Sequence, residues 1–294
     1  MKKILTALAL VLTAGTALAA DLPHYKAPLP PPPPPPPLWT GFYVGLNAGG
    51  TWANNNSIYV TNWPAGGAFS VANLLLSGSL SANNGAGFIG GGQIGYNWQF
   101  YNGSLVAGIE ADIQGIAGSR GGSNSWAAVP IATITIGDTP VPINLLSNVN
   151  VRRSLDYLGT VRGRLGWLFT PTLLVYGTGG LAYGGVNVNV SNFQALTLGG
   201  LIIPAQFGAG SLSDTRVGWT AGGGIEWMFW PNWSAKAEYL YYDLGTAAGS
   251  AVNVGLAGTV VSISQFSTRF NGNIVRAGVN YHFNWGAPPV VAKY

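Results

Sequence analysis

The sequence contains no cysteine, and only 7% of its 294 residues are charged. The absence of cysteine excludes disulfide frameworks, thiol catalysis and cysteine-based metal sites. Water-soluble domains carry about 25% charged residues, so the low charge argues against an ordinary soluble domain. Beyond the N-terminal segment there is no run of about 18 apolar residues, which excludes membrane-spanning helices from the rest of the chain.

Apolar residues are nevertheless abundant, at 48% of the chain, and glycine occurs 44 times. From Trp39 onward the apolar residues alternate with polar ones, which is the period of a β-strand with one apolar and one polar face. This alternation predicts an all-β protein, an eight-stranded antiparallel transmembrane β-barrel. The predicted strands cover residues 39–52, 86–100, 105–116, 155–167, 173–184, 216–229, 233–244 and 274–283.

The last predicted strand, residues 274–283, shows the alternation clearly. Val279, Tyr281 and Phe283 share one face, whereas Arg276 lies on the other. The apolar face ends in two aromatic residues, as expected where a membrane-spanning strand meets its aromatic girdle. We therefore predict that Val279, Tyr281 and Phe283 form the insertion signal for the barrel-assembly machinery.

Short and long connections alternate between the predicted strands. Asn102-Gly103 is a hairpin-turn signal that sets Phe100 opposite Leu105. Short turns on one rim and long loops on the other are typical of the periplasmic and extracellular sides of an outer-membrane barrel. The sequence therefore predicts long extracellular loops and, with an even strand number, both termini in the periplasm. The predicted loops cover residues 53–85, 117–154, 185–215 and 245–268.

Charged residues of the predicted strands test the assignment of the faces. The apolar residues alone decide which face of each strand points outward. With the faces assigned in this way, ten charged residues fall on the inward face: Glu110, Asp112, Asp156, Arg162, Arg164, Arg216, Glu226, Lys236, Glu238 and Arg276. An eight-stranded barrel is just wide enough for side chains to fill it. We therefore predict a network of ion pairs in the lumen, in which Glu226 pairs with Lys236. A soluble lipocalin-like barrel would show the reverse polarity.

The segments outside the barrel have their own signatures. Residues 1–19 combine two lysines, an apolar run and Ala17-Leu18-Ala19, which predicts a secretory signal peptide. Residues 20–38 contain eight consecutive prolines and are expected to form a stiff periplasmic linker. The barrel is then expected to span residues 39–283, and a periplasmic tail residues 284–294. These signals place the protein in the outer membrane of a Gram-negative envelope.

No motif in the sequence predicts catalysis. The two histidines, His24 and His282, both fall on the periplasmic side, away from the outer rim where a barrel enzyme would need one. The GGGQIG run, Gly90–Gly95, fits a nucleotide-binding pattern but lies within a predicted strand that no helix follows. We predict no enzyme activity, no catalytic, cofactor or metal site, and no binding of nucleic acid.

Several segments resemble a known family. They are WTGFYVGLNAGG (39–50), GGQIGYNWQ (91–99), GIEADIQG (108–115), GTVRGRLGW (159–167), VYGTGGLAYG (175–184) and WSAKAEYLYYDLG (233–245). They are similar to the small outer-membrane proteins of alphaproteobacteria, a porin family of the OmpA-type barrel group that includes outer-membrane immunogenic proteins. The resemblance implies an eight-stranded barrel with surface-exposed loops that is abundant in the envelope.

Three functions remain open at this stage. The first is a non-enzymatic structural barrel and surface antigen whose loops interact outside the cell. The second is a porin for small solutes, and the third is a surface receptor for haem or another ligand, with Tyr59 as a candidate contact. The expected partners are outer-membrane lipid and lipopolysaccharide, the assembly machinery, and an extracellular ligand of the loops.

Overall fold

The computed structural model describes residues 39–64, 76–84, 86–100 and 103–283. The predicted signal peptide, proline-rich linker and C-terminal tail lie outside these residues. All of the regular structure within the described ranges is β-strand. Among the described residues, no helix is long and apolar enough to cross a membrane.

The strands follow one another along the chain in twelve elements. They are β1 (Gly41–Ala53), β2 (Ser57–Pro64), β3 (Gly78–Ser81), β4 (Asn83–Asn84), β5 (Gly87–Phe100), β6 (Leu105–Ala117), β7 (Arg120–Ile136), β8 (Thr139–Thr170), β9 (Leu173–Leu198), β10 (Leu201–Trp230), β11 (Trp233–Gly255) and β12 (Val260–Phe283).

Eight of these strands form a closed antiparallel ring in the order β1-β5-β6-β8-β9-β10-β11-β12, and β12 pairs back to β1. The ring confirms the predicted eight-stranded barrel. Phe100 pairs with Leu105 across the first short turn, as predicted. Closure pairs the edge backbone groups of β1 and β12 with each other, which a strand in hydrocarbon requires.

The outward face of the ring is apolar and carries aromatic residues at two levels. On β10, Trp219 marks the upper level, and Trp227 and Phe229 mark the lower one; Ile225 lies between them, and all four side chains are exposed. Trp219 and Phe229 are separated by about 33 Å of strand at about 3.3 Å per residue, or about 25 Å of height at a tilt of about 40°. This height matches the apolar band of an outer-membrane barrel.

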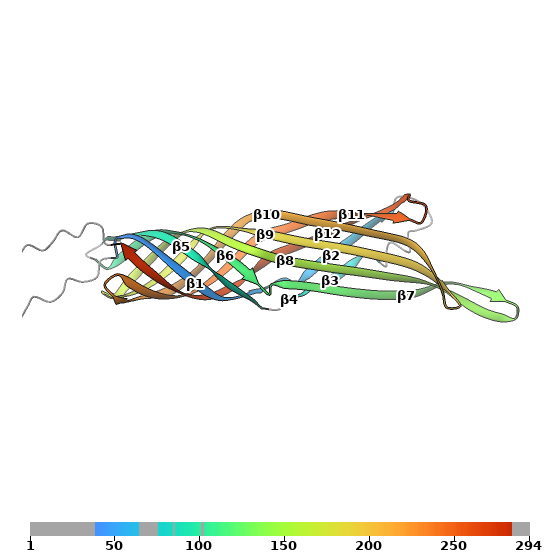
Figure 1. Cartoon of the computed structure of the whole chain (residues 1–294), viewed down its shortest axis with the longest axis horizontal. Helices are drawn as coiled ribbons and strands as arrows, with labels where there is room; N and C mark the ends of the chain where they lie inside the picture. The colour runs from blue at the N-terminus through green and yellow to red at the C-terminus, as the bar shows by residue number, and fades with distance from the viewer. Residues whose placement is uncertain (1–38, 65–75, 85, 101–102, 284–294) are drawn as a thin grey trace, which may run out of the picture. The chain divides into compact units, whose positions relative to one another are not determined.

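Above the upper aromatic level, the structure differs from the predicted loops. Strands β8 to β12 continue past the ends of β1, β5 and β6, with β2, β3 and β7 beside them (Figure 1). There β2 pairs with β12 in place of β1, and β7 pairs with β8 in place of β6. We call this β-walled part the extension; it comprises β2, β3, β4, β7 and the continuing parts of β8 to β12.

The extension has the opposite polarity to the ring. On β9, Val186, Val188 and Val190 are buried inside, whereas Asn189 and Ser191 are exposed outside. In the ring the inner face is charged and the outer face is apolar. The inversion marks the outer edge of the membrane, because a wall in water must bury its apolar face inside.

Candidate functional site

Eight of the ten charged side chains assigned to the lumen are buried there, each with at most 4% of its surface exposed. They are Glu110, Asp112, Arg162, Arg164, Glu226, Lys236, Glu238 and Arg276. Four are acidic and four are basic, so the cluster is formally neutral. A neutral cluster is what burial requires, since an uncompensated charge would be strongly destabilising. We call these eight residues the lumen network.

Arg162 on β8 contacts three carboxylates of the lumen network. Its Nη1 atom lies 2.9 Å from Glu238 Oε1, and its Nη2 atom lies 2.9 Å from Asp112 Oδ2. The same Nη2 atom also contacts Glu110, which lies opposite Arg162 in the β6–β8 ladder. Opposite charges facing each other across two strands stabilise the pairing. Arg162 therefore joins β6 and β8 to β11 across the lumen.

Arg276 on β12 makes a second set of contacts. Its Nε atom donates to Glu238 Oε2 at 2.8 Å, and its Nη2 atom lies 2.9 Å from Asp112 Oδ2. Glu238 and Arg276 are also cross-strand partners in the β11–β12 ladder. Because Asp112 and Glu238 are each shared by two arginines, the network is a mesh in which the loss of one residue affects several others.

Glu226 and Lys236 face each other in the β10–β11 ladder, as predicted, but the predicted ion pair between them is wrong. The Lys236 Nζ atom lies 2.8 Å and 2.9 Å from the two oxygens of Glu110. Glu226 instead binds Arg164 Nη1 at 2.9 Å. The register brought the two residues side by side, but a long flexible lysine reaches across the lumen to another carboxylate.

Uncharged polar residues complete the lumen network, and the pattern of charges alone does not reveal them. The Tyr43 hydroxyl donates to Glu110 Oε2 at 2.7 Å, and Arg164 Nε donates to Asn97 Oδ1 at 2.8 Å. The Arg164 guanidinium also lies 4.8 Å from the centre of the Tyr43 ring. The inward parity of Tyr43 and Asn97 was a signal in the sequence that could have identified them.

Buried apolar side chains lie at both ends of the lumen network. Those near the short turns are Trp39, Val106, Leu168, Leu174, Tyr176 and Met228. Those toward the extension include Leu158, Ala182, Val186, Val188, Leu240, Leu244, Phe270 and Ile274. Trp39 is completely buried, and its indole Nε1 donates to the Pro171 carbonyl at 3.0 Å. The lumen is therefore occupied in three successive layers: apolar, charged and apolar.

Two of the ten lumen assignments are wrong. Asp156 is exposed on the outside, where it accepts hydrogen bonds from Ser154 at 3.0 Å and Asn187 at 2.6 Å. The β8–β9 register shifts between Leu155 and Tyr157, and this bulge reverses the parity of the residues above it. Arg216 is half-buried at the upper edge, and its Nε atom lies 3.3 Å from Asp214. It lies too high to join the network.

Arg153 is a buried charge that the sequence pattern did not identify, because it falls in the predicted loop 117–154. In the structure it lies on β8, and the same bulge sets it on the inward face. Its Nη1 atom donates to Thr268 Oγ1 at 3.2 Å, and its guanidinium lies 4.4 Å from the centre of the Phe270 ring. Burial lowers the pKa of the Arg153 guanidinium, and the nearby Tyr242 raises it. Within the described part of the chain, Arg153 has no carboxylate partner.

Ser234, His282 and Glu226 meet at the end of the lumen near the short turns but do not form a catalytic triad. The Ser234 hydroxyl lies 2.9 Å from His282 Nε2, and Glu226 Oε1 lies 3.4 Å from the same nitrogen. A triad places the carboxylate on the other ring nitrogen, where it orients the imidazole. All three side chains are buried. In the described ranges, no three His, Asp or Glu side chains are grouped to hold a metal ion.

The family described as "Outer membrane protein beta-barrel domain" matches residues 6–283, nearly the whole chain. The chain belongs to this outer-membrane β-barrel family. The assignment agrees with the closed ring, its apolar outer face and its two aromatic levels. Like other members of the outer-membrane β-barrel family, the protein resides in the outer membrane.

Two outer-membrane immunogenic proteins of Brucella are similar to this chain along nearly its full length. The 31 kDa outer-membrane immunogenic protein of Brucella melitensis is 36% identical over 293 residues, which cover 96% of this chain and 100% of that protein. The 25 kDa outer-membrane immunogenic protein of Brucella abortus is 25% identical over 287 residues, which cover 95% of this chain and 97% of that protein. The crystal structure of the outer membrane protein OprG from Pseudomonas aeruginosa can be superposed on this chain with a TM-score of 0.37 and 10% sequence identity. The superposition covers 83% of this chain and 97% of the OprG chain.

Proposed function

We propose that the protein is a closed, non-enzymatic barrel of the envelope that holds the extension outside the cell as a surface for interactions. In this role it is a structural component and a surface antigen. The observation that carries the proposal is the filled lumen. Eight buried charges span the interior, and buried apolar residues lie above and below them.

The contacts of the network support a closed barrel rather than a pore. Arg162 alone binds carboxylates from β6 and β11, so its side chain extends across the interior. A hydrated ion would have to separate such pairs and then pass the apolar layer that contains Val186 and Leu240. Barrels that enclose water have about sixteen or more strands, twice the number in this ring.

The extension supports a role outside the membrane. The segment of β8 from Thr139 to Asp156 continues for roughly 60 Å of strand at about 3.3 Å per residue. Its neighbours β7 and β9 pair with it over most of that length. Paired strands hold their side chains in fixed positions, so the extension presents a defined surface rather than flexible loops.

A conductance measurement tests the closed lumen. The full-length protein, folded in detergent, is added to a planar lipid bilayer, and a sixteen-stranded porin in a parallel chamber serves as the positive control. We expect no steady channel from the wild-type protein. The difference in gel migration between heated and unheated samples shows that the barrel is folded.

Steady, large conductance of the folded wild-type barrel would overturn the proposal in favour of the small-solute porin. Charge reversal at Arg162 would then alter the ion selectivity, since this residue would line the path. The receptor alternative is tested with soluble haem. Tyr59 on β2 is exposed, so saturable haem binding that is lost in Tyr59→Phe would support a receptor instead.

A further inference from the structure

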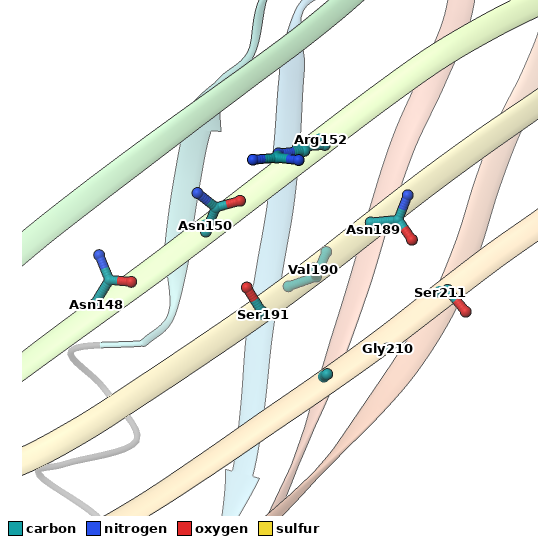
Figure 2. A pocket seen from close by; sticks show the side chains of 9 residues that line it. Asn148, Asn150, Arg152, Asn189, Val190, Ser191, Gly210 and Ser211 are labelled. Carbon is teal, nitrogen blue, oxygen red and sulfur yellow. The ribbon is translucent and has the colours of Figure 1, made fainter.

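Two adjoining hollows form one depression on the outer wall of the extension. The first has a volume of about 660 Å³ and lies over β8, β9 and β10; the second, of about 550 Å³, lies over β7, β8 and β9. Arg152 and Asn189 line both hollows. We call this depression the wall groove. Figure 2 shows the side chains that line the first hollow.

The strand registers place hydrogen-bonding side chains in rows across the wall groove. Arg152 pairs with Asn189, which pairs in turn with Ser211 on β10. Two residues farther from the ring along β8 and β9, Asn150 pairs with Ser191. Residues that pair directly lie on the same face of the sheet, so these side chains all project outward. The order β8, β9, β10 can be followed in Figure 2.

These side chains are available to a ligand. Within the described part of the chain, Asn150, Asn189, Ser191 and Ser211 make no side-chain hydrogen bond to another residue. Amides and hydroxyls both donate and accept hydrogen bonds, as the hydroxyl groups of a sugar do. A row of them on a rigid wall matches the repeating hydroxyls of an oligosaccharide.

Positive charge is concentrated at the membrane-proximal end of the wall groove. Arg120 and Arg152 both line the second hollow and both are exposed. Neither side chain forms an ion pair with any described residue. Asp156 also lines this hollow, where its carboxylate accepts hydrogen bonds from the neutral groups of Ser154 and Asn187 and keeps its negative charge, so the two exposed arginines outnumber it by one. Two free guanidinium groups favour a phosphate or carboxylate, which they can bind through paired hydrogen bonds.

An aromatic ring lies just beyond the distal end of the wall groove. Trp126 on β7 pairs with Asn148, which lines the first hollow, and 59% of the Trp126 side chain is exposed. The Asn148 amide itself donates to Asn124 and to the Ser125 carbonyl, so the exposed indole is the group that Trp126 and Asn148 together offer to a ligand: a flat apolar surface on which the apolar face of a sugar ring can stack. Cation, amide and indole thus follow one another along the strands, from the membrane outward.

The height of the wall groove identifies the source of the sugar. On β10, Ser211 lies above the aromatic level of Trp219 by about 26 Å of strand, or about 20 Å of height at a tilt of about 40°. The outer leaflet of this membrane presents phosphorylated sugars at that level. A soluble glycan would have to compete with them for the same groups.

We propose that the wall groove binds the phosphorylated core oligosaccharide of lipopolysaccharide molecules in the same leaflet. Arg120 and Arg152 bind its phosphate or acidic groups, Asn150, Asn189, Ser191 and Ser211 bind sugar hydroxyls, and Trp126 stacks on a ring. The proposal rests on the proposed role of the extension as an interaction surface, and it gives that surface a ligand.

Calorimetric titration with the core oligosaccharide tests the assignment. The probe is released from the lipid by mild acid, so its binding cannot reflect insertion into detergent or bilayer. We expect saturable binding to the full-length protein, about tenfold or more weaker binding to Arg152→Gln, and weaker binding to Trp126→Ala. Enzymatic dephosphorylation of the probe should weaken binding to the wild type more than binding to Arg152→Gln, in which only Arg120 is left to bind the phosphate.

Arg269→Gln is the matched control. Arg269 is an exposed arginine on β12 that binds Asp243 and lies outside the wall groove. Equal losses in Arg269→Gln and Arg152→Gln would overturn the proposal, because they would indicate general attraction of an anion. Absence of binding to the core, or binding only of a soluble sulfated glycan such as heparin, would also overturn it. Conductance is measured separately, so a silent barrel that binds no core refutes the wall groove and leaves the closed-barrel function intact.

Discussion

Lys236 lies directly opposite Glu226 in the β10–β11 ladder, yet its ammonium group binds Glu110 on β6, across the lumen. Backbone register therefore brings charges to the same level but does not select the partner. Selection depends on the conformation that each side chain adopts inside the lumen. Arg164, whose guanidinium lies over the Tyr43 ring, binds Glu226.

The first prediction follows from this exchange of partners. Lys236→Glu should destabilise the barrel by about 3 to 5 kcal/mol, because it leaves buried carboxylates without compensation. A second substitution, Glu110→Lys, should recover more of the lost stability than Glu226→Lys does. The free energy of unfolding in urea, measured for the single and double variants, gives both coupling energies. Greater recovery by Glu226→Lys would show that the register partner is the energetic partner.

The second prediction contrasts two buried arginines. Arg162 binds three carboxylates, whereas Arg153 binds a carbonyl and a hydroxyl and lies over Phe270. Arg162→Met should cost about 3 to 5 kcal/mol of unfolding free energy, since it leaves an excess of buried negative charge. Arg153→Met removes a buried cation without a counter-charge, so it should change stability by at most about 1 kcal/mol. Urea unfolding of both variants checks the contrast, and equal losses would contradict it.

The membrane-embedded part of the fold could be predicted from the sequence because two physical constraints agree there. Lipid requires an apolar outer face, and a lumen filled by side chains tolerates charge only in balanced pairs. Both constraints appear as period-two patterns, so the alternation alone assigns Glu110 and Arg162 to the lumen. The pattern could not show which carboxylate each cation contacts, since that depends on side-chain conformations.

The extension was predicted as loops for a different reason. Its strands are rich in Asn, Ser and Gly, which have low β-propensity, and its apolar face turns inward rather than outward. The alternation of apolar and polar residues in Val186–Asn192 is nevertheless regular. It would have predicted a strand if the outer face had been expected to contact water there and not lipid. Asp156 was misplaced because one bulge residue shifts the parity, and nothing in the local sequence marks the bulge.

The third prediction concerns insertion. We propose that the assembly machinery binds Val279, Tyr281 and Phe283 on β12. The rings of Tyr281 and Phe283 contact each other, with their centres 5.1 Å apart. The double variant Tyr281→Ala, Phe283→Ala should reduce the yield of folded barrel in the outer membrane. Trp98→Ala, Phe100→Ala removes two aromatics of the same girdle from β5 and is the matched control. Wild-type yield of the β12 variant in membrane fractions would refute the signal.

The fourth prediction tests whether the extension is a wall or a set of loops. Val190 and Ser191 are neighbours on β9, but Val190 is 2% exposed inside the extension and Ser191 is exposed outside. Val190→Asp places a carboxylate in the apolar interior, where it lacks a partner, so the extension should open locally. Ser191→Asp adds the same charge on the water side and should leave the extension intact.

Limited proteolysis of the folded protein distinguishes the two variants. The extension of Val190→Asp should be cleaved much faster than that of wild type, while the barrel itself should still migrate as a folded species on an unheated gel. Its ring lies below the substitution and retains every contact of the lumen network. Ser191→Asp should match wild type in both assays. If both variants resist cleavage equally, or both are cleaved as fast as flexible segments, then Val190 does not face a packed interior and the polarity inversion at the rim is incorrect.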